Sequence, residues 1–143
     1  MKAITINNPR AQLIASRKQT LLVRDKDIDY RGDLLIRAGE CLAPWEVPGL
    51  LDIPDFLDMS ANGGCVVGVV TVVGYRPMRP IDEAKAFSFY TVDSWVLELE
   101  NPRLLRIPFP VGNDTGIFDV IPPVFSELLT DEQRNFYYGN IKE

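Results

Sequence analysis

The chain has 143 residues, of which 46% are hydrophobic and 24% charged, proportions typical of one soluble globular domain rather than a disordered or fibrous protein. It contains no histidine and two cysteines, which excludes Ser-His-Asp and Cys-His catalysis and any imidazole-bound metal. The net charge of −5 argues against a general nucleic-acid coat protein. The longest apolar stretch, residues 65–73, is far shorter than the ~20 residues that span a bilayer. We expect a cytoplasmic protein without a membrane partner.

Charge is distributed unevenly along the chain. Residues 1–37 carry eight basic and four acidic side chains, whereas residues 38–143 carry seven basic and sixteen acidic ones. A surface built from the first third of the chain could therefore hold a polyanion. The alternative is that charges of both signs are simply solvated over the whole surface.

A strand followed by a helix is predicted at the start of the chain. Residues 2–6 alternate in polarity as in a strand. Asn8 is placed to cap a helix, with Pro9 at its first position, where a missing N–H costs little. Apolar residues then recur at helical spacing through Ser16.

The remaining strands are predicted from runs of branched and apolar residues. The stretch at 64–75 is continuous rather than alternating, so we expect a central strand buried on both faces, with Cys65 as a small buried hydrophobe. A turn at Asn101-Pro102 is expected to separate two others. These strands are expected at residues 18–24, 33–38, 64–75, 91–100, 103–109 and 116–121.

Few helices are expected between these strands. Three prolines break residues 39–63 into short turns with one or two helical turns among them. A short helix is predicted at residues 81–89, and Thr130 with Gln133 forms a capping box for a last helix through Tyr138. The pattern indicates one α+β domain over residues 1–143, a small mixed barrel with a C-terminal helical extension at 122–143.

Three short motifs are better explained by local structure than by function. Aspartates alternate over residues 25–29 as in a calcium loop, but Tyr30 and Ile36 stand where that loop needs glycine and a bidentate acid. Residues 31–33 (RGD) predict a turn. The glycine pair at 63–64 lacks the lysine and helix of a phosphate loop. We expect no metal and no cofactor.

Five segments, taken in chain order, carry a family pattern. They are residues 3–11 (AITINNPRA), 17–24 (RKQTLLVR), 30–39 (YRGDLLIRAG), 64–70 (GCVVGVV) and 99–103 (LENPR). They resemble the motifs LSIxQPxA, GxKTxExR, YRGxLLIHA, GxVVGVV and LENPR of ASCH domains, which belong to the PUA-like superfamily. The resemblance covers roughly residues 1–121. It implies a small PUA-like β-barrel with a cleft beside the first helix and the KTxExR strand.

The resemblance also bears on activity. Members of the family are thought to bind RNA or modified nucleobases, and some bacterial members hydrolyse N⁴-acetylcytidine with a lysine, a threonine and a distant glutamate. In this chain Gln19 stands at the lysine position and Leu22 at the threonine position. Lys18 is one residue out of register and would point to the opposite strand face. The resemblance therefore implies binding without catalysis.

Several polar residues remain to bind a ligand at the implied cleft. Thr20 and Arg24 lie four residues apart, hence on one predicted strand face, with Leu22 between them. Arginines can hold phosphate or a base edge through two bonds, although Arg24 could instead pair with the aspartates that follow it. Tyr90 or Trp95 could stack a base, with a place in the core as the alternative for Trp95. The candidate ligand-binding residues are Asn8, Arg10, Lys18, Gln19, Thr20, Arg24, Arg37 and Tyr90.

Three functions are compatible with these observations. The leading hypothesis is a module that binds single-stranded RNA, a nucleotide or a modified nucleobase. The first alternative is an enzyme, either an amidohydrolase acting on N⁴-acylated cytidine or a ribonuclease, which the family alone suggests. The second alternative is a protein-interaction module, suggested by the negative net charge and by Trp45 and Phe56 in the proline-rich segment.

Overall fold

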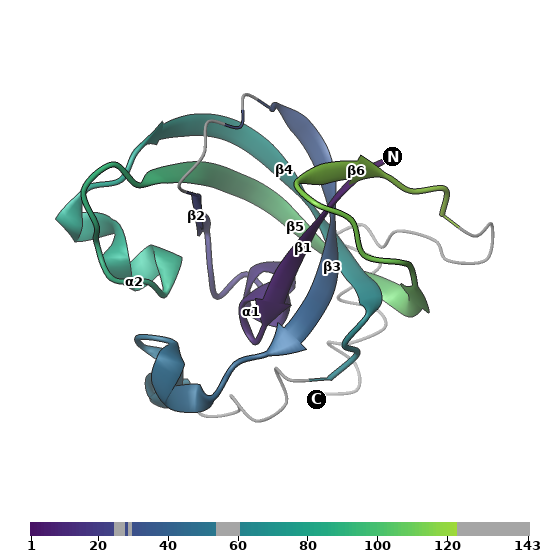
Figure 1. Cartoon of the computed structure of the whole chain (residues 1–143), viewed down its shortest axis with the longest axis horizontal. Helices are drawn as coiled ribbons and strands as arrows, with labels where there is room; N and C mark the ends of the chain where they lie inside the picture. Colours follow the sequence, from purple (N-terminus) through teal and green to yellow (C-terminus); the bar gives the residue numbers. More distant parts are fainter. Residues whose placement is uncertain (25–27, 29, 54–60, 123–143) are drawn as a thin grey trace.

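The computed structural model describes residues 1–24, 28, 30–53 and 61–122 (Figure 1). Its strands are β1 (Lys2–Asn8), β2 (Leu21–Arg24), β3 (Gly32–Cys41), β4 (Cys65–Pro77), β5 (Trp95–Pro110) and β6 (Ile117–Asp119). Its helices are α1 (Arg10–Ala15) and α2 (Glu83–Ala86), with 3-10 turns η1 (Pro44–Glu46), η2 (Leu50–Asp52) and η4 (Pro80–Asp82). The strands form one sheet in the order β2-β5-β4-β3-β1-β6. Among these described strands only β1 and β3 pair in parallel, so the fold is α+β.

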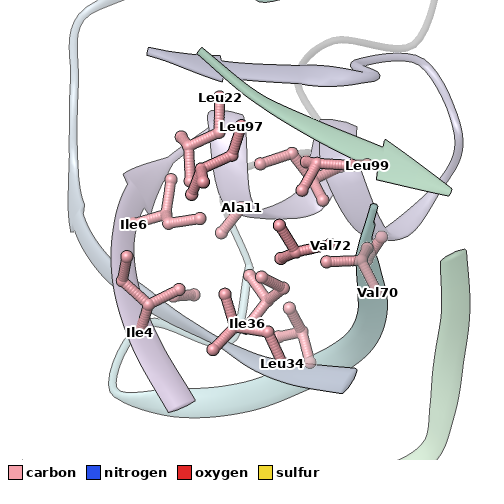
Figure 2. Packing of buried hydrophobic residues seen from close by; sticks show 14 residues of the cluster. Ile4, Ile6, Ala11, Leu22, Leu34, Ile36, Val70, Val72, Leu97 and Leu99 are labelled. Carbon is pink, nitrogen blue, oxygen red and sulfur yellow. The ribbon is translucent and has the colours of Figure 1, made fainter. Parts of the chain in front are cut away.

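The sheet curls but does not close within the described residues, so the predicted barrel is not confirmed. Side chains from β1 to β5 converge with Ala11 of α1 on one interior core (Figure 2). Within the described residues, however, β2 pairs only with β5, while β6 takes the free edge of β1 over Lys2, Ala3 and Ile4. None of the described strands lies beside the rest of that β1 edge, so an open seam remains between β1 and β2.

The central strand is confirmed. β4 pairs with β3 on one side and β5 on the other, and it buries side chains on both faces. Val67, Val70 and Val72 pack in the interior core, whereas Val66 and Val69 pack with a second cluster. Cys65, expected to be buried, is only half-buried, because it is the first residue of the strand; Cys41 is exposed, and both are free thiols.

The first helix begins one residue later than predicted. Asn8 is the last residue of β1, and Pro9 occupies the N-cap position of α1, which has no side-chain cap. The Asn8 side chain is fully buried and donates from Nδ2 to the Ala61 carbonyl oxygen at 2.9 Å. Asn8 thus ties β1 to a distant segment and does not cap the helix.

β2 is shorter than the predicted strand at 18–24. The backbone N–H groups of Lys18 and Gln19 donate to the Leu13 carbonyl oxygen at 2.9 and 3.0 Å, and so complete the end of α1. The Thr20 N–H donates to the Lys85 carbonyl oxygen at 3.2 Å. These residues are bonded to helices, so regular pairing with β5 starts only at Leu21.

Two predicted strands are one in the structure. β5 runs through Asn101-Pro102 without a turn, because β4 pairs with it on both sides of this point. The pairing register between β4 and β5 shifts near this point, and Asn101 accommodates the shift with a left-handed φ of 50°. The strand also starts at Trp95 and not at residue 91. The helix predicted at 81–89 is reduced to η4 and α2, since Phe87 leaves the helical region with a φ of 48°.

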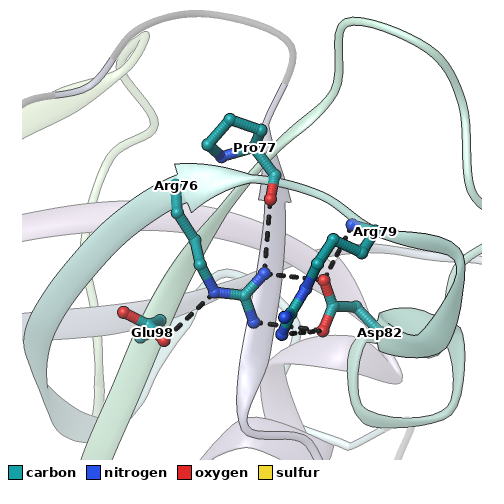
Figure 3. A network of polar contacts seen from close by, with 5 residues as sticks. All are labelled: Arg76, Pro77, Arg79, Asp82 and Glu98. Carbon is teal, nitrogen blue, oxygen red and sulfur yellow. Dashed lines mark hydrogen bonds and ion pairs between the residues drawn. The ribbon is translucent and has the colours of Figure 1, made fainter.

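An ion-pair network joins the end of β4 to η4 and β5 (Figure 3). The Arg76 guanidinium donates to the Asp82 carboxylate at 2.7 and 3.0 Å and to Glu98 Oε2 at 3.2 Å. The backbone N–H of Arg79 donates to the same Asp82 carboxylate at 2.8 Å. The hydrogen bonds from Arg76 hold the pKa of Asp82 well below its usual range.

Some expectations concern parts of the chain that the structure does not describe. The aspartates at 25, 27 and 29, Phe56, and the C-terminal helix with Thr130, Gln133 and Tyr138 all lie outside the described residues. Among the residues that are described, no helix combines the length and apolarity needed to cross a bilayer. No three Cys, Asp or Glu side chains of that part are grouped to hold a metal ion.

Candidate functional site

The open seam between β1 and β2 holds a pocket of about 350 Å³, which we call the seam pocket. Its walls come from the unpaired edge of β1, the first residue of α1, β2 and the segment after α2. The lining residues are Thr5, Ile6, Asn7, Arg10, Leu22, Val23, Arg24 and Ser88. The incomplete closure of the sheet therefore creates this pocket.

The seam pocket combines an apolar floor with polar walls. Ile6 and Leu22 belong to the interior core (Figure 2). The Thr5 hydroxyl donates to Asn113 Oδ1 at 2.8 Å and that of Ser88 to the Ala86 carbonyl oxygen at 3.1 Å, so both oxygens keep lone pairs for accepting a bond. No carboxylate lines the pocket in the described part of the chain. Its two charged residues are Arg10 and Arg24.

Arg10 is held in place but keeps hydrogen-bonding capacity. Its Nη2 donates to the Phe87 carbonyl oxygen at 2.9 Å. Its Nε is buried without a hydrogen-bond partner, and none of the described carboxylates forms an ion pair with it. Burial lowers the pKa of Arg10 from its usual value, but an arginine remains charged at neutral pH. The pocket thus contains a positive charge suited to an anion.

A second pocket, of about 520 Å³, lies against residues 17–20, the linker between α1 and β2. We call it the linker pocket. The lining residues are Ile14, Arg17, Gln19, Thr20, Val70, Leu99, Glu100, Asn101 and Pro102. It shares no lining residue with the seam pocket.

The structure divides the predicted site residues between the two pockets. Arg10 and Arg24 line the seam pocket, with Leu22 at its floor, whereas Gln19 and Thr20 line the linker pocket. Thr20 and Arg24, predicted to share one strand face, therefore line different pockets. Thr20 precedes β2, and its N–H donates to the Lys85 carbonyl oxygen while its carbonyl oxygen accepts from the Leu99 N–H.

The other predicted residues lie in neither pocket. Asn8 is bonded to Ala61, Arg37 donates from Nε to the Val111 carbonyl oxygen at 2.9 Å, and the exposed Lys18 lies at the end of α1. The two aromatic residues proposed to stack a base, Tyr90 and Trp95, pack instead against other side chains of the protein. The Tyr90 ring packs on the cluster of Leu21, Met78, Ala86 and Val96, and Trp95 is half-buried and stacks on Tyr75 with ring centroids 4.6 Å apart.

Sequence reasoning missed three polar residues of the seam pocket. Thr5 and Asn7 alternate with Ile4 and Ile6 on β1, so the period of the first strand could have identified them. Ser88 had no comparable signal. It reaches the pocket from a segment more than 60 residues further along the chain than β2.

No family model matches the sequence, and no curated protein matches it. Three solved structures from Zymomonas mobilis are similar, each at 11% sequence identity. The ASCH protein itself has a TM-score of 0.53, covering 96% of this chain and 93% of that chain. Its tyrosine-to-phenylalanine mutant gives 0.52, with 96% of each chain covered, and its serine-to-alanine mutant 0.51, with 97% and 94% covered. At this identity the likeness concerns the fold alone.

Proposed function

We infer that this protein, which has the ASCH-domain fold, binds single-stranded RNA or a nucleotide in the seam pocket without hydrolysing it. The observation that carries this proposal is the lining of the seam pocket. Arg10 and Arg24 stand beside an apolar floor, and no carboxylate lines the pocket in the described residues. Such a site suits a ligand that joins a negative charge to a flat ring.

Each part of the pocket has a role in this proposal. The two guanidinium groups take phosphate oxygens, since their fixed geometry allows two parallel bonds to one anion. The Arg10 guanidinium has five N–H donors, and the bond from Nη2 to the Phe87 carbonyl oxygen leaves others for the phosphate. Leu22 and Ile6 offer an apolar surface to a base ring, while the oxygens of Thr5 and Ser88 accept bonds from its N–H groups.

We predict that replacing Arg24 strongly weakens the binding of single-stranded RNA. Arg24→Ala should weaken the binding of a short fluorescent single-stranded RNA by about 5- to 150-fold, the loss of one bidentate contact worth about 1–3 kcal/mol. Arg24→Lys should recover little, because an ammonium group lacks the fork of donors. Fluorescence polarisation measures all three affinities, with Arg31→Ala as the matched control, since Arg31 is exposed and lines neither pocket.

The dependence of RNA binding on salt concentration, together with the Arg24→Ala variant, distinguishes binding in the seam pocket from the alternative role of Arg24. Binding to wild-type protein should weaken steeply as salt rises, because phosphate contacts release counterions. If Arg24 serves only to neutralise the aspartates that follow it, Arg24→Ala changes stability slightly and leaves binding unaltered. Equal RNA affinities for wild type and Arg24→Ala would therefore eliminate the seam pocket as the binding site.

No hydrolysis of N⁴-acetylcytidine is expected. Leu22, at the position of the family threonine, is an apolar part of the pocket floor, and Gln19 lines the other pocket. No described carboxylate lines the seam pocket to activate water. Incubation of purified protein with N⁴-acetylcytidine, followed by mass spectrometry, should show no cytidine above background. Robust turnover that disappears in Arg24→Ala would contradict this.

A further inference from the structure

The segment that leads from α2 to β5 carries an exposed aromatic side chain beside the seam pocket (Figure 1). Ser88 lines the pocket, and the next residue, Phe89, is 72% exposed. Phe89 belongs to none of the hydrophobic clusters in the described part of the chain. A single exposed apolar residue is ordinary on a protein surface. The position of Phe89 next to a ligand pocket, and not its exposure alone, therefore points to a role in binding.

The residues on both sides of Phe89 are anchored in the protein. Phe87 ends α2 with a left-handed φ of 48° and packs its buried side chain against α1 and the η1–η2 segment. The backbone N–H of Tyr90 donates to Glu83 Oε2 at 2.6 Å, and the Tyr90 ring packs on its own cluster. The backbone of Phe89 is thus held on both sides while its ring faces solvent. An aromatic ring on a fixed backbone has only two χ angles to order, so binding to it costs little conformational entropy.

The same segment keeps Phe89 close to the charged wall of the seam pocket. Arg10 Nη2 donates to the Phe87 carbonyl oxygen at 2.9 Å, and two residues of chain span at most about 7 Å. The pocket volume of about 350 Å³ lies near the lower end of the roughly 300–1,000 Å³ found for small-molecule sites, which suits one nucleotide. A strand with one nucleotide in the pocket would therefore leave the neighbouring base outside it, on the side where Phe89 lies.

We propose that Phe89 stacks on the base next to the nucleotide in the seam pocket, so that the preferred ligand is a single strand of at least two nucleotides and not a free nucleotide. This inference rests on the proposed function and makes its ligand more specific. Stacking on an aromatic side chain strengthens binding by about 5- to 150-fold per base. It tolerates every base, because each has a π face. A duplex could not use Phe89 in this way, since its bases are already stacked on one another.

Two dinucleotides of equal charge test the proposal on the wild-type protein. One is 5′-phosphorylated diadenylate, and the other is the same compound with an abasic second residue, which keeps both phosphates and lacks one base. Calorimetric titration should show that the diadenylate binds about 5- to 150-fold more tightly. In NMR spectra the base protons of one adenine should move upfield on binding, because they lie over the face of a phenyl ring. Equal affinities for the two compounds would overturn the proposal.

Substitutions of Phe89 separate stacking from simple apolar contact. Phe89→Leu keeps an apolar side chain without a π face, so the variant should bind the diadenylate no more tightly than the abasic compound. Phe89→Tyr keeps the ring and should retain the preference. Thermal unfolding should show both variants folded, because the side chain is exposed. Ile81→Ala is the matched control, since Ile81 is 79% exposed and lines neither pocket. A Phe89→Leu protein with the full wild-type preference would also overturn the proposal.

The outcomes distinguish a failure of this inference from a failure of the proposed function. The abasic compound reports on the seam pocket alone, since it has no second base to stack. If both compounds bind with equal, salt-dependent affinity and Arg24→Ala weakens both, the seam pocket is retained and the role of Phe89 is lost. If neither compound binds, the seam pocket is eliminated as the nucleotide site, and the role of Phe89 is eliminated with it.

Discussion

Replacing Val67 by aspartate should abolish the cooperative unfolding transition of the protein. Val67 lies in β4, the strand paired on both sides, and its side chain is 2% exposed within the interior core. A carboxylate at this position would be buried without a partner, which costs several kcal/mol. A domain of this size has about 5–15 kcal/mol of stability in total. We expect no thermal transition by circular dichroism.

Two variants control for the position and for the loss of volume. Val73→Asp introduces the same charge into the same strand at a side chain that is 45% exposed, and it should unfold cooperatively near the wild-type temperature. Val67→Ala removes only methyl groups and should be folded but less stable. A Val67→Asp protein with wild-type thermal stability would show that this part of β4 is peripheral.

The second large effect is expected at Asp82. Asp82→Asn should lower the free energy of unfolding by about 3–5 kcal/mol at neutral pH, as when one partner of a buried ion pair is removed. The Asp82 side chain is 4% exposed and that of Arg76 27%, so the pair is largely shielded from water. The asparagine would leave the Arg76 charge with Glu98 as its remaining carboxylate partner (Figure 3).

The stability of a matched variant at a surface ion pair, Asp119→Asn, shows whether the effect at Asp82 comes from burial. Asp119 lies 2.9 Å from Lys2, but its side chain is 79% exposed. Asp119→Asn should therefore leave urea unfolding unchanged within error. Equal losses of stability in Asp82→Asn and Asp119→Asn would show that burial does not strengthen the Arg76 pair.

The pH dependence gives an independent check of the Asp82 pair. Hydrogen bonds from Arg76 hold the pKa of Asp82 below its value of about 3.9 in an unfolded chain. Stability from this group is therefore fully present above that value and is lost as the pH falls towards the lower folded pKa. Below about pH 3 the gap between wild type and Asp82→Asn should narrow by about 1.4 kcal/mol per pH unit. A constant gap would contradict this assignment of the pKa.

The candidate site was only partly predictable. Arg10 and Arg24 could be selected from their place beside the first helix and on the second strand, and both line the seam pocket. That Thr20 lines a different pocket from Arg24 could not be predicted, since its partners Lys85 and Leu99 lie far along the chain. Ser88 enters the pocket by the same kind of long-range contact. Local spacing says where a side chain points on its own element, not which distant segment faces it.

The sequence by itself determined approximately where the strands lie and which strand is central. The continuous apolar run at 64–75 predicts burial on both faces, and β4 packs Val67, Val70 and Val72 in one buried cluster and Val66 and Val69 in another. Only the tertiary structure decided the ends of the elements and the closure of the sheet. β2 starts late because helix-end hydrogen bonds take Lys18 and Gln19. The sheet stays open because, among the described strands, none pairs with this edge of β1 beyond residue 4. Backbone groups bond to whichever partner the fold brings near, and no local pattern encodes that choice. It leaves the open seam that Arg10 and Arg24 both line.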